Sequence, residues 1–448
     1  MAKSPNVIVF LTDQQRWDTT GLNGNPLDLT PNLDRVAREG THVRYSFTCQ
    51  PVCGPARSSL QTGLYATQTG CFTNGIPLDP ELPTLATWFR EAGYRTGYIG
   101  KWHLASRDPV PEGERGGYQD WLASNVLEFT SDAYDTVMYD EAGEARKLPG
   151  YRVDALTDAA IDYVDRHQHD PFFLFISYLE PHHQNHRDDY PAPVGYRERY
   201  EGRWMPPDLA ALGGTAHQQY GGYCGMVKRL DEAYGRLLDA LRSLDLLDDT
   251  IVLFTSDHGN HFKTRNGEYK RSLHEASIRV PTVLTGPGFT GGGEIHELVS
   301  LVDLPPTLLD AAGIDVPENL PGRSLLQLTQ RRCSEGWPDD VYIQISESHT
   351  GRAIRTQRWK YGVAAPDSTP LSDPWSDTYR ETELYDLVAD PHELNNLIHQ
   401  ESHDELCRAL RERLQARMAA TGEPPADIIP AERRPSGQRR VTVTELLE

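Results

Sequence analysis

The segment Asn6-Val-Ile-Val-Phe-Leu-Thr12 is a short apolar run, and the polar pair Asp13-Gln14 follows directly after it. A continuous apolar run of this length is typical of a strand that is buried on both faces of a parallel sheet. Similar runs return further along the chain, at Tyr94–Ile99, Phe172–Tyr178, Thr250–Thr255 and Val280–Thr285. Helical patterns separate these runs, so the sequence predicts an α/β fold with a large, mainly parallel sheet flanked by helices.

The intervening helices have recognisable boundaries. Thr30-Pro31 provides an N-cap and a first-turn proline for one helix, which Gly40 ends. A second short helix is expected over Leu85–Ala92. Apolar residues that recur at three- and four-residue steps predict two longer helices, Asp154–Arg166 and Gly225–Leu244.

The character of the sequence changes near residue 335. Three short apolar segments follow at hairpin spacing, and one more helix is expected over Asp404–Ala420. We therefore expect three parts: a catalytic α/β domain over 1–335, a small C-terminal α+β subdomain with an antiparallel sheet and a helix over 336–423, and an extended tail over 424–448. The tail is a candidate oligomer arm, so a homodimer or homotetramer is expected.

Composition and charge exclude several classes of protein. The 448 residues include 44 Lys and Arg against 65 Asp and Glu, which gives a net charge of −21 and argues against a nucleic-acid or anionic membrane partner. No apolar run reaches the roughly 18 residues of a membrane-spanning helix. The apolar run near the N-terminus is shorter than a secretory signal core, so we expect a cytoplasmic protein. An anionic substrate must then bind in a local cationic pocket.

Polar residues whose side chains could bind a ligand or take part in catalysis follow four of the predicted strands. Because ligands bind beyond the carboxyl ends of strands in open α/β sheets, we expect these residues to meet at one edge. They are Asp13-Gln14, Lys101 with His103, His182-His183 and Asp257-His258. Two carboxylates, an amide oxygen and an imidazole predict a divalent cation at Asp13, Gln14, Asp257 and His258. We expect Ca²⁺, with Mn²⁺ or Mg²⁺ as alternatives.

A cysteine-containing segment forms a second candidate site. Six cysteines occur, at positions 49, 53, 71, 224, 333 and 407, and their spacing does not suggest a disulfide framework. Cys53 precedes Pro55 and Arg57 at a predicted helix start, where backbone N–H groups favour negative charge. The simpler interpretation of this pattern is a buried thiol at a helix cap.

The pentad Cys53-Gly-Pro-Ala-Arg57 resembles the C-x-[PS]-x-R signature of the type I sulfatases, in the alkaline phosphatase superfamily. Motifs around Lys101, His182, Asp257 and Lys270 resemble the same family in the same order, and the resemblance covers nearly the whole chain. It implies an alkaline-phosphatase-like fold. It also implies that a dedicated maturation enzyme converts Cys53 to formylglycine (3-oxoalanine), whose hydrated aldehyde attacks sulfur and also binds the metal.

The resemblance further implies roles for individual residues. Arg57 would stabilise the formylglycine hydrate, and Lys101 would bridge the hydrate and the sulfate. His103 would deprotonate the spare hydroxyl, His182 would protonate the leaving oxygen, and Lys270 would hold the sulfate. For the substrate-binding wall we expect Asn74, His183 and His186.

One departure from the family pattern leaves the substrate open. Many sulfatases carry Asp-Asp and Asp-Asn where this chain has Asp13-Gln14 and Asp257-His258, a set closer to phosphonate monoester hydrolases and choline-sulfatase-like enzymes. We expect a sulfatase that hydrolyses a small organic sulfate ester, specifically a carbohydrate sulfate. The alternatives are a phosphonate monoester or phosphodiester hydrolase with the same site, and a catalytically silent protein that binds anions.

Overall fold

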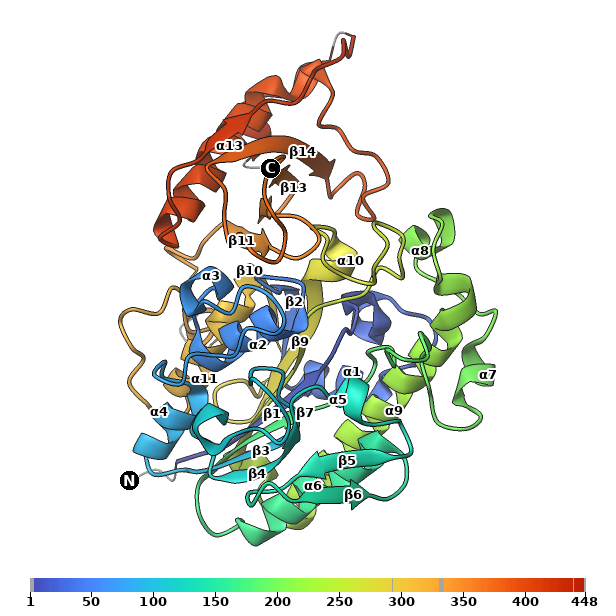
Figure 1. Ribbon diagram of the computed structural model, residues 1–448, viewed down its shortest axis with the longest axis vertical. Helices are drawn as coiled ribbons and strands as arrows, with labels where there is room; N and C mark the ends of the chain where they lie inside the picture. The colour runs from blue at the N-terminus through green and yellow to red at the C-terminus, as the bar shows by residue number, and fades with distance from the viewer. Residues whose placement is uncertain (1–3, 292, 330–333, 438, 447–448) are drawn as a thin grey trace.

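The computed structural model describes residues 4–291, 293–329, 334–437 and 439–446 of the chain, so Cys333 lies outside the described residues. Its main element is a large ten-stranded sheet (Figure 1). The strands follow one another across the sheet in the order β10 (Gly293–Ser300), β2 (Thr41–Phe47), β9 (Arg279–Thr285), β8 (Thr250–Ser256), β1 (Asn6–Thr12), β7 (Phe172–Ser177), β3 (Arg95–Lys101), β4 (Asp120–Ser124), β5 (Thr136–Tyr139) and β6 (Ala145–Leu148).

The middle of this sheet is parallel, as the sequence predicts. The strands β8, β1, β7, β3 and β4 are paired in parallel, whereas β9 and β5 run against their neighbours. The five expected apolar runs correspond to β1, β3, β7, β8 and β9, and the α/β fold class is confirmed. Strand β2 was not predicted, because polar residues interrupt its sequence Thr-His-Val-Arg-Tyr-Ser-Phe.

Helices cover both faces of the large sheet. Along β1, Val7, Val9 and Leu11 pack into a core with α2, α4 and α11, whereas Ile8 and Phe10 face α1, α6 and α9. This alternation is the two-residue period of a strand that is buried on both faces. The helices are α1 (Pro31–Glu39), α2 (Cys53–Thr62), α3 (Ala66–Thr69), α4 (Leu85–Glu91), α5 (Leu127–Thr130), α6 (Arg152–Arg166), α7 (Tyr196–Tyr200), α8 (Pro207–Ala211), α9 (Ala216–Ser243), α10 (Glu275–Ile278), α11 (Leu304–Ala311) and α12 (Leu326–Thr329).

Helix α9 begins at Ala216, nine residues before the predicted start at Gly225. The predicted start was wrong. Gly222 and Gly225 lie in the first half of this helix, where they allow close packing. A Cβ atom on Gly222 would lie 2.5 Å from the carbonyl oxygen of Tyr190, and one on Gly225 would lie 2.8 Å from the Cβ atom of Ala192.

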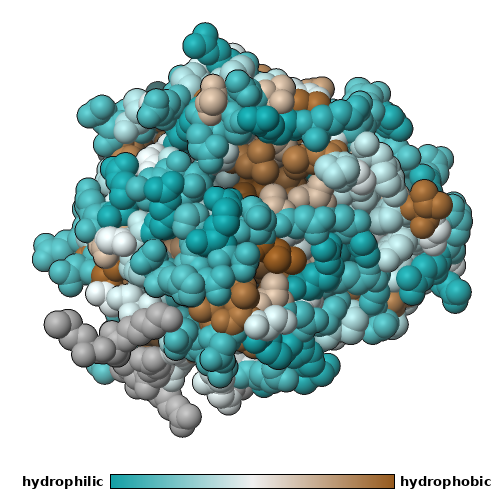
Figure 2. Space-filling view, turned by 90° about the horizontal axis from the view of Figure 1, so that it is seen from below, coloured by the Kyte–Doolittle hydropathy of each residue, from teal (hydrophilic) through white to brown (hydrophobic). Residues whose placement is uncertain are grey.

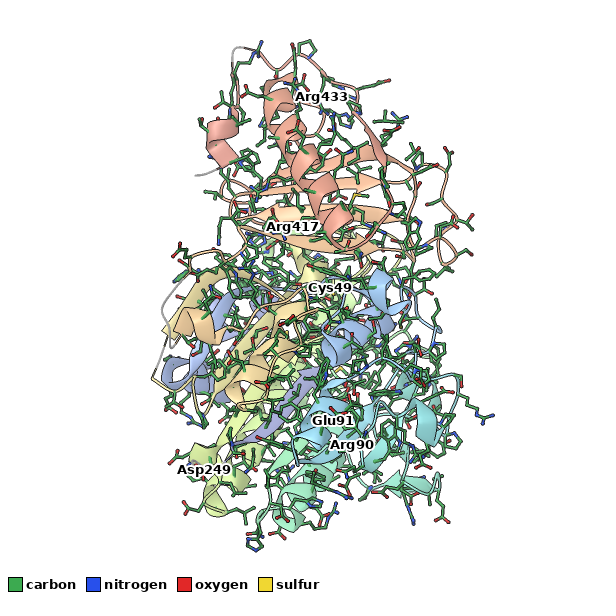
Figure 3. All side chains as sticks on the ribbon, turned by 90° about the vertical axis from the view of Figure 1, so that its left-hand side faces the viewer. Cys49, Arg90, Glu91, Asp249, Arg417 and Arg433 are labelled. Carbon is green, nitrogen blue, oxygen red and sulfur yellow. The ribbon has the colours of Figure 1, made fainter. Side chains whose placement is uncertain are left out.

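The C-terminal part forms a second, five-stranded sheet, covered by α13 (Asp404–Ala420). Its strands are β11 (Asp340–Ile345), β12 (Gly351–Thr356), β13 (Trp359–Ala364), β14 (Thr378–Asp386) and β15 (Asp427–Ile429). The pairs from β11 to β14 are antiparallel, but β15, which lies in the expected tail, pairs in parallel with β14 of the same chain. Figure 3 shows Cys49 where the two sheets meet, and its carbonyl oxygen accepts a hydrogen bond from the Gln344 N–H of β11 at 2.8 Å. The three-part division at residues 335 and 423 stays a prediction.

The surface shown in Figure 2 is mostly hydrophilic, with apolar side chains in small patches. Within the described residues, the helices lack an apolar segment of the length that crossing a bilayer requires.

Gly100 in β3 provides a test of the fold. Its φ is +117°, and an added Cβ atom would lie 1.9 Å from the carbonyl oxygen of Ser177. We expect Gly100→Ala to lower the free energy of unfolding by about 3 kcal/mol or more, because strain and overlap with backbone add together. The matched control is Gly113→Ala, where nothing lies within 4 Å of the new Cβ atom. Equal urea denaturation midpoints for the two variants would contradict this account.

Candidate active site

Cys53 is the first residue of α2, and it is 1% exposed. The helix begins at this point because Val52 is extended and Pro55 fits the first helical turn. The Cys53 thiol lies among side chains from distant parts of the chain. Its Sγ atom is close to Lys270 Nζ (2.9 Å), His258 Nε2 (3.3 Å), Asp13 Oδ1 (3.6 Å) and Lys101 Nζ (3.6 Å).

The large sheet places these groups. Asp13 follows β1, Lys101 ends β3, and Asp257 follows β8, so their side chains meet at one edge of the parallel strands. Lys101 Nζ lies 2.7 Å from Asp13 Oδ2. The structure therefore brings together the residues that the sequence placed after separate strands.

Arg57, one turn into α2, holds two of the acidic groups. Its guanidinium donates to Asp13 Oδ2 and to Asp257 Oδ2, each at 3.1 Å. It also donates to the Lys101 carbonyl oxygen at 2.9 Å and to Ser177 Oγ at 2.6 Å. A planar guanidinium with several donors is suited to such a buried cluster. Arg57 therefore links α2 to the ends of β1, β3, β7 and β8.

Four of the predicted metal-binding positions form one buried group. Ligand atoms of Asp13, Cys53, Asp257 and His258 all lie within 4.8 Å of one another. The fifth position, Gln14, is also buried, and its Oε1 atom has no hydrogen-bond partner. A buried polar atom without a partner is costly unless a ligand satisfies it. The donor set of carboxylates, imidazole and amide oxygen therefore fits a divalent cation.

The charges in this group shift the pKa of several members. Burial and the neighbouring Asp13 carboxylate raise the pKa of Asp257 to about 6. Burial also opposes ionisation of Cys53, but Lys101, Lys270 and His258 together hold the pKa of its thiol well below the usual value. Position 53 is thus a place where negative charge is stabilised, unlike Cys71, whose thiol pKa burial raises to about 12.

Two histidines line the same pocket as Cys53. His182 Nε2 is 3.0 Å from Lys270 Nζ, and burial together with Lys270 lowers the pKa of His182. His103 has a left-handed backbone (φ +63°), and its Nδ1 atom lies 3.6 Å from Glu128 Oε1. Glu128 Oε1 also lies 2.9 Å from Lys101 Nζ. Strained backbone of this kind is often found at functional sites.

A pocket of about 270 Å³ opens beside these residues. Of the predicted site residues, it is lined by Cys53, Asn74, His103, His182, His183 and Lys270. His186 does not line it: its half-exposed side chain lies 3.1 Å from Asp132. Its predicted contact with substrate therefore has no support from this geometry.

Glu347, from the C-terminal part, connects two loops at the pocket. Its carboxylate accepts from the Asn74 N–H and from Arg271 Nε, each at 2.5 Å. Asn74 Oδ1 in turn accepts from the Gly54 N–H at 2.8 Å. The loop after β11 therefore helps to fix the backbone beside Cys53.

Several residues of this site were not predicted from the sequence. Among them are Glu128, Phe129, Arg271 and Glu347. Arg271 had a usable signal, because it directly follows Lys270. The other three had none, because their contacts join residues that are far apart in the chain and follow no local pattern.

Comparisons with known proteins agree with this arrangement. Residues 5–314 match the family model for sulfatases, and residues 267–420 match the model for the C-terminal part of N-sulphoglucosamine sulphohydrolase. The chain is 30% identical to the ulvan-active sulfatase of Formosa agariphila over 438 residues, covering 94% of this chain and 82% of the relative.

Solved structures show the same fold. BT4656, solved in complex with its substrate D-glucosamine-2-N,6-O-disulfate, matches with a TM-score of 0.77 at 25% identity, covering 94% of this chain and 98% of that one. The phosphonate monoester hydrolase of Agrobacterium radiobacter shares the fold with a TM-score of 0.70 at 24% identity, covering 93% and 96%. Because the sulfatase model covers most of the chain, the protein belongs to the sulfatase family of the alkaline phosphatase superfamily and is a sulfuric ester hydrolase.

Proposed function

We propose that this protein hydrolyses a carbohydrate sulfate ester, with formylglycine formed from Cys53 and one divalent cation at the active site. The observation that carries the proposal is the convergence on the Cys53 Sγ atom of Lys101, Lys270, His258 and Asp13, all within 3.6 Å. Relatives that act on sulfated sugars support the carbohydrate part, since they include an N-acetylglucosamine-6-O-sulfatase of Bacteroides thetaiotaomicron.

When present, formylglycine supplies a hydrated aldehyde oxygen as nucleophile, and the cation supplies Lewis acidity. Asp13, Gln14, Asp257 and His258 would hold the cation. The chain's own cations, Arg57, Lys101 and Lys270, are buried around position 53 and are fixed before substrate binds. Preorganised positive charge of this kind stabilises the charge that develops on a transferring sulfate.

Two histidines would carry the protons. We assign His182 Nε2 to the leaving oxygen, because the Lys270 ammonium lies 3.0 Å away and both line the pocket. A bound sulfate would offset the charge of Lys270, which otherwise disfavours a proton on His182. We assign His103 to deprotonation at position 53; the Glu128 carboxylate lies 3.6 Å from its Nδ1 atom.

Several finer parts of the proposal rest on the sequence. Calcium is the expected metal because the donor set is rich in oxygen. A maturation enzyme is needed to form formylglycine. The cytoplasmic location and the homodimer or homotetramer also stay predictions.

The alternative reaction is hydrolysis of a phosphonate monoester, which the Asp13-Gln14 and Asp257-His258 set favours. Both substrates carry one negative charge, so electrostatics alone does not separate them. We expect kcat/KM for N-acetylglucosamine 6-sulfate to exceed that for a phenyl phosphonate monoester by about tenfold or more, equivalent to roughly 1.4 kcal/mol in barrier height. Steady-state kinetics on one metal-loaded preparation decides this, and the reverse ranking would reject the sulfatase assignment.

Replacement of Cys53 tests whether this residue provides the nucleophile, and whether the protein is instead a catalytically silent anion-binding protein. We expect Cys53→Ala to lower kcat by about 10³-fold or more, the scale seen when a covalent nucleophile is removed. The melting temperature should change little, because the side chain faces the pocket and not the apolar core. Cys224→Ala, at a buried thiol in another cluster, is the control and should retain activity.

Mass spectrometry of the peptide that contains position 53 completes this test. In wild-type protein produced with a competent maturation enzyme, we expect the lighter aldehyde, in which oxygen replaces sulfur and two hydrogens are lost. Thiol alone, with no turnover, would favour the silent anion-binding protein.

The metal site is tested at Asp257. We expect Asp257→Ala to weaken binding of Ca²⁺ or Mn²⁺ by about 100-fold or more, because a charged ligand is lost. The measurement is calorimetric titration of metal-free protein. Asp257→Asn keeps the size of the side chain, so a loss of affinity in this variant is not due to a cavity. Asp239→Ala, at an exposed carboxylate on α9, is the control. Unchanged affinity in both Asp257 variants would place the metal elsewhere.

A further inference from the structure

Phe129 is an apolar ring in a pocket with mostly polar walls. It belongs to α5 and lines the pocket beside Cys53. Its side chain is 63% exposed, the highest value for an aromatic residue within the described part of the chain. Because this ring lines the pocket beside Cys53, a bound molecule can replace the water that contacts it, and that exchange is favourable for a phenyl group.

The backbone on both sides of the ring is anchored. Leu127 is fully buried, and the Glu128 carboxylate lies 2.9 Å from Lys101 Nζ. The buried Gln184 amide donates to the carbonyl oxygens of Glu128 (2.7 Å) and Ser131 (2.8 Å). The backbone that carries Phe129 is therefore held in place before substrate binds, which lowers the entropic cost of using this residue as a contact.

Polar groups share the pocket with this ring. Arg271 and Glu268 both line it, and the two side chains form an ion pair with each other. Arg271 is also held by Glu347, at 2.5 Å. A guanidinium beside a carboxylate offers donors and acceptors to neighbouring hydroxyl groups. The pocket therefore combines one apolar face with hydroxyl-binding groups.

We infer that Phe129 is a specificity-determining residue, whose ring packs against the apolar C–H face of a pyranose in the substrate. The inference rests on the proposed function and specifies how the sugar is recognised. The face of an aromatic ring carries partial negative charge, which attracts the weakly positive C–H groups of a sugar. An acyclic sulfate ester lacks a flat C–H face and gains little from this contact.

The test compares two substrates across variants of Phe129. The substrates are N-acetylglucosamine 6-sulfate and the acyclic 2-hydroxyethyl sulfate. We expect Phe129→Ala and Phe129→Leu to lower kcat/KM for the sugar sulfate by about tenfold, mainly through a higher KM. Phe129→Tyr keeps the ring and should stay near wild type. Activity on the acyclic ester should stay near wild type in all three variants.

Trp204→Ala is the matched control, because this exposed aromatic residue does not line the pocket. Equal loss on both substrates, or full activity of Phe129→Leu on the sugar sulfate, would overturn the inference while leaving the proposed function intact. A wild-type enzyme that hydrolyses only the acyclic ester would overturn both. Circular dichroism of each variant separates these results from misfolding.

Discussion

Buried charge is the constraint around which this active site is built. The side chains of Arg57, Asp13 and Asp257 are each at most 2% exposed. Ions in such surroundings are stable only when they are paired and hydrogen-bonded, and removal of one partner leaves the others uncompensated. Arg57 meets this requirement with donors to both carboxylates, to a backbone carbonyl and to a hydroxyl. The position of α2, and hence of Cys53, follows from this cluster.

Parallel strand pairing supplies the geometry that the cluster needs. In the β1–β8 register Thr12 lies opposite Ser256, so the next residues, Asp13 and Asp257, leave the sheet side by side. The Asp257 N–H also donates to the Thr12 carbonyl oxygen at 3.2 Å. Strand β3 brings Lys101 to the same edge, where its ammonium is shared by Asp13 and Glu128. Sheet register therefore fixes the spacing of Asp13 and Asp257, and β3 adds Lys101 at the same edge.

The sequence predicted those parts of the protein that have a local signature. The apolar runs located the central strands, and the residues after them located the charged centre. Strand β2 and the start of α9 were missed, because polar residues interrupt the first and close-packed glycines occupy the second. Glu128 and Glu347 carry no local pattern, since their importance comes from contacts with Lys101 and with Arg271 across the fold. Such residues become visible only when distant segments are placed together.

The structure separates a centre of paired, buried charges from a rim of less buried residues. The centre depends on paired buried charges, so a change there disturbs several groups at once. The rim includes Asn74 and Arg271, which Glu347 of the loop after β11 holds together, and Phe129 on α5. Phe129 carries no charge, so a substitution there removes none of the charge pairs of the centre. A fold of this kind can change the alcohol that it recognises while keeping the same means of cleaving the ester, because recognition and charge compensation depend on different side chains.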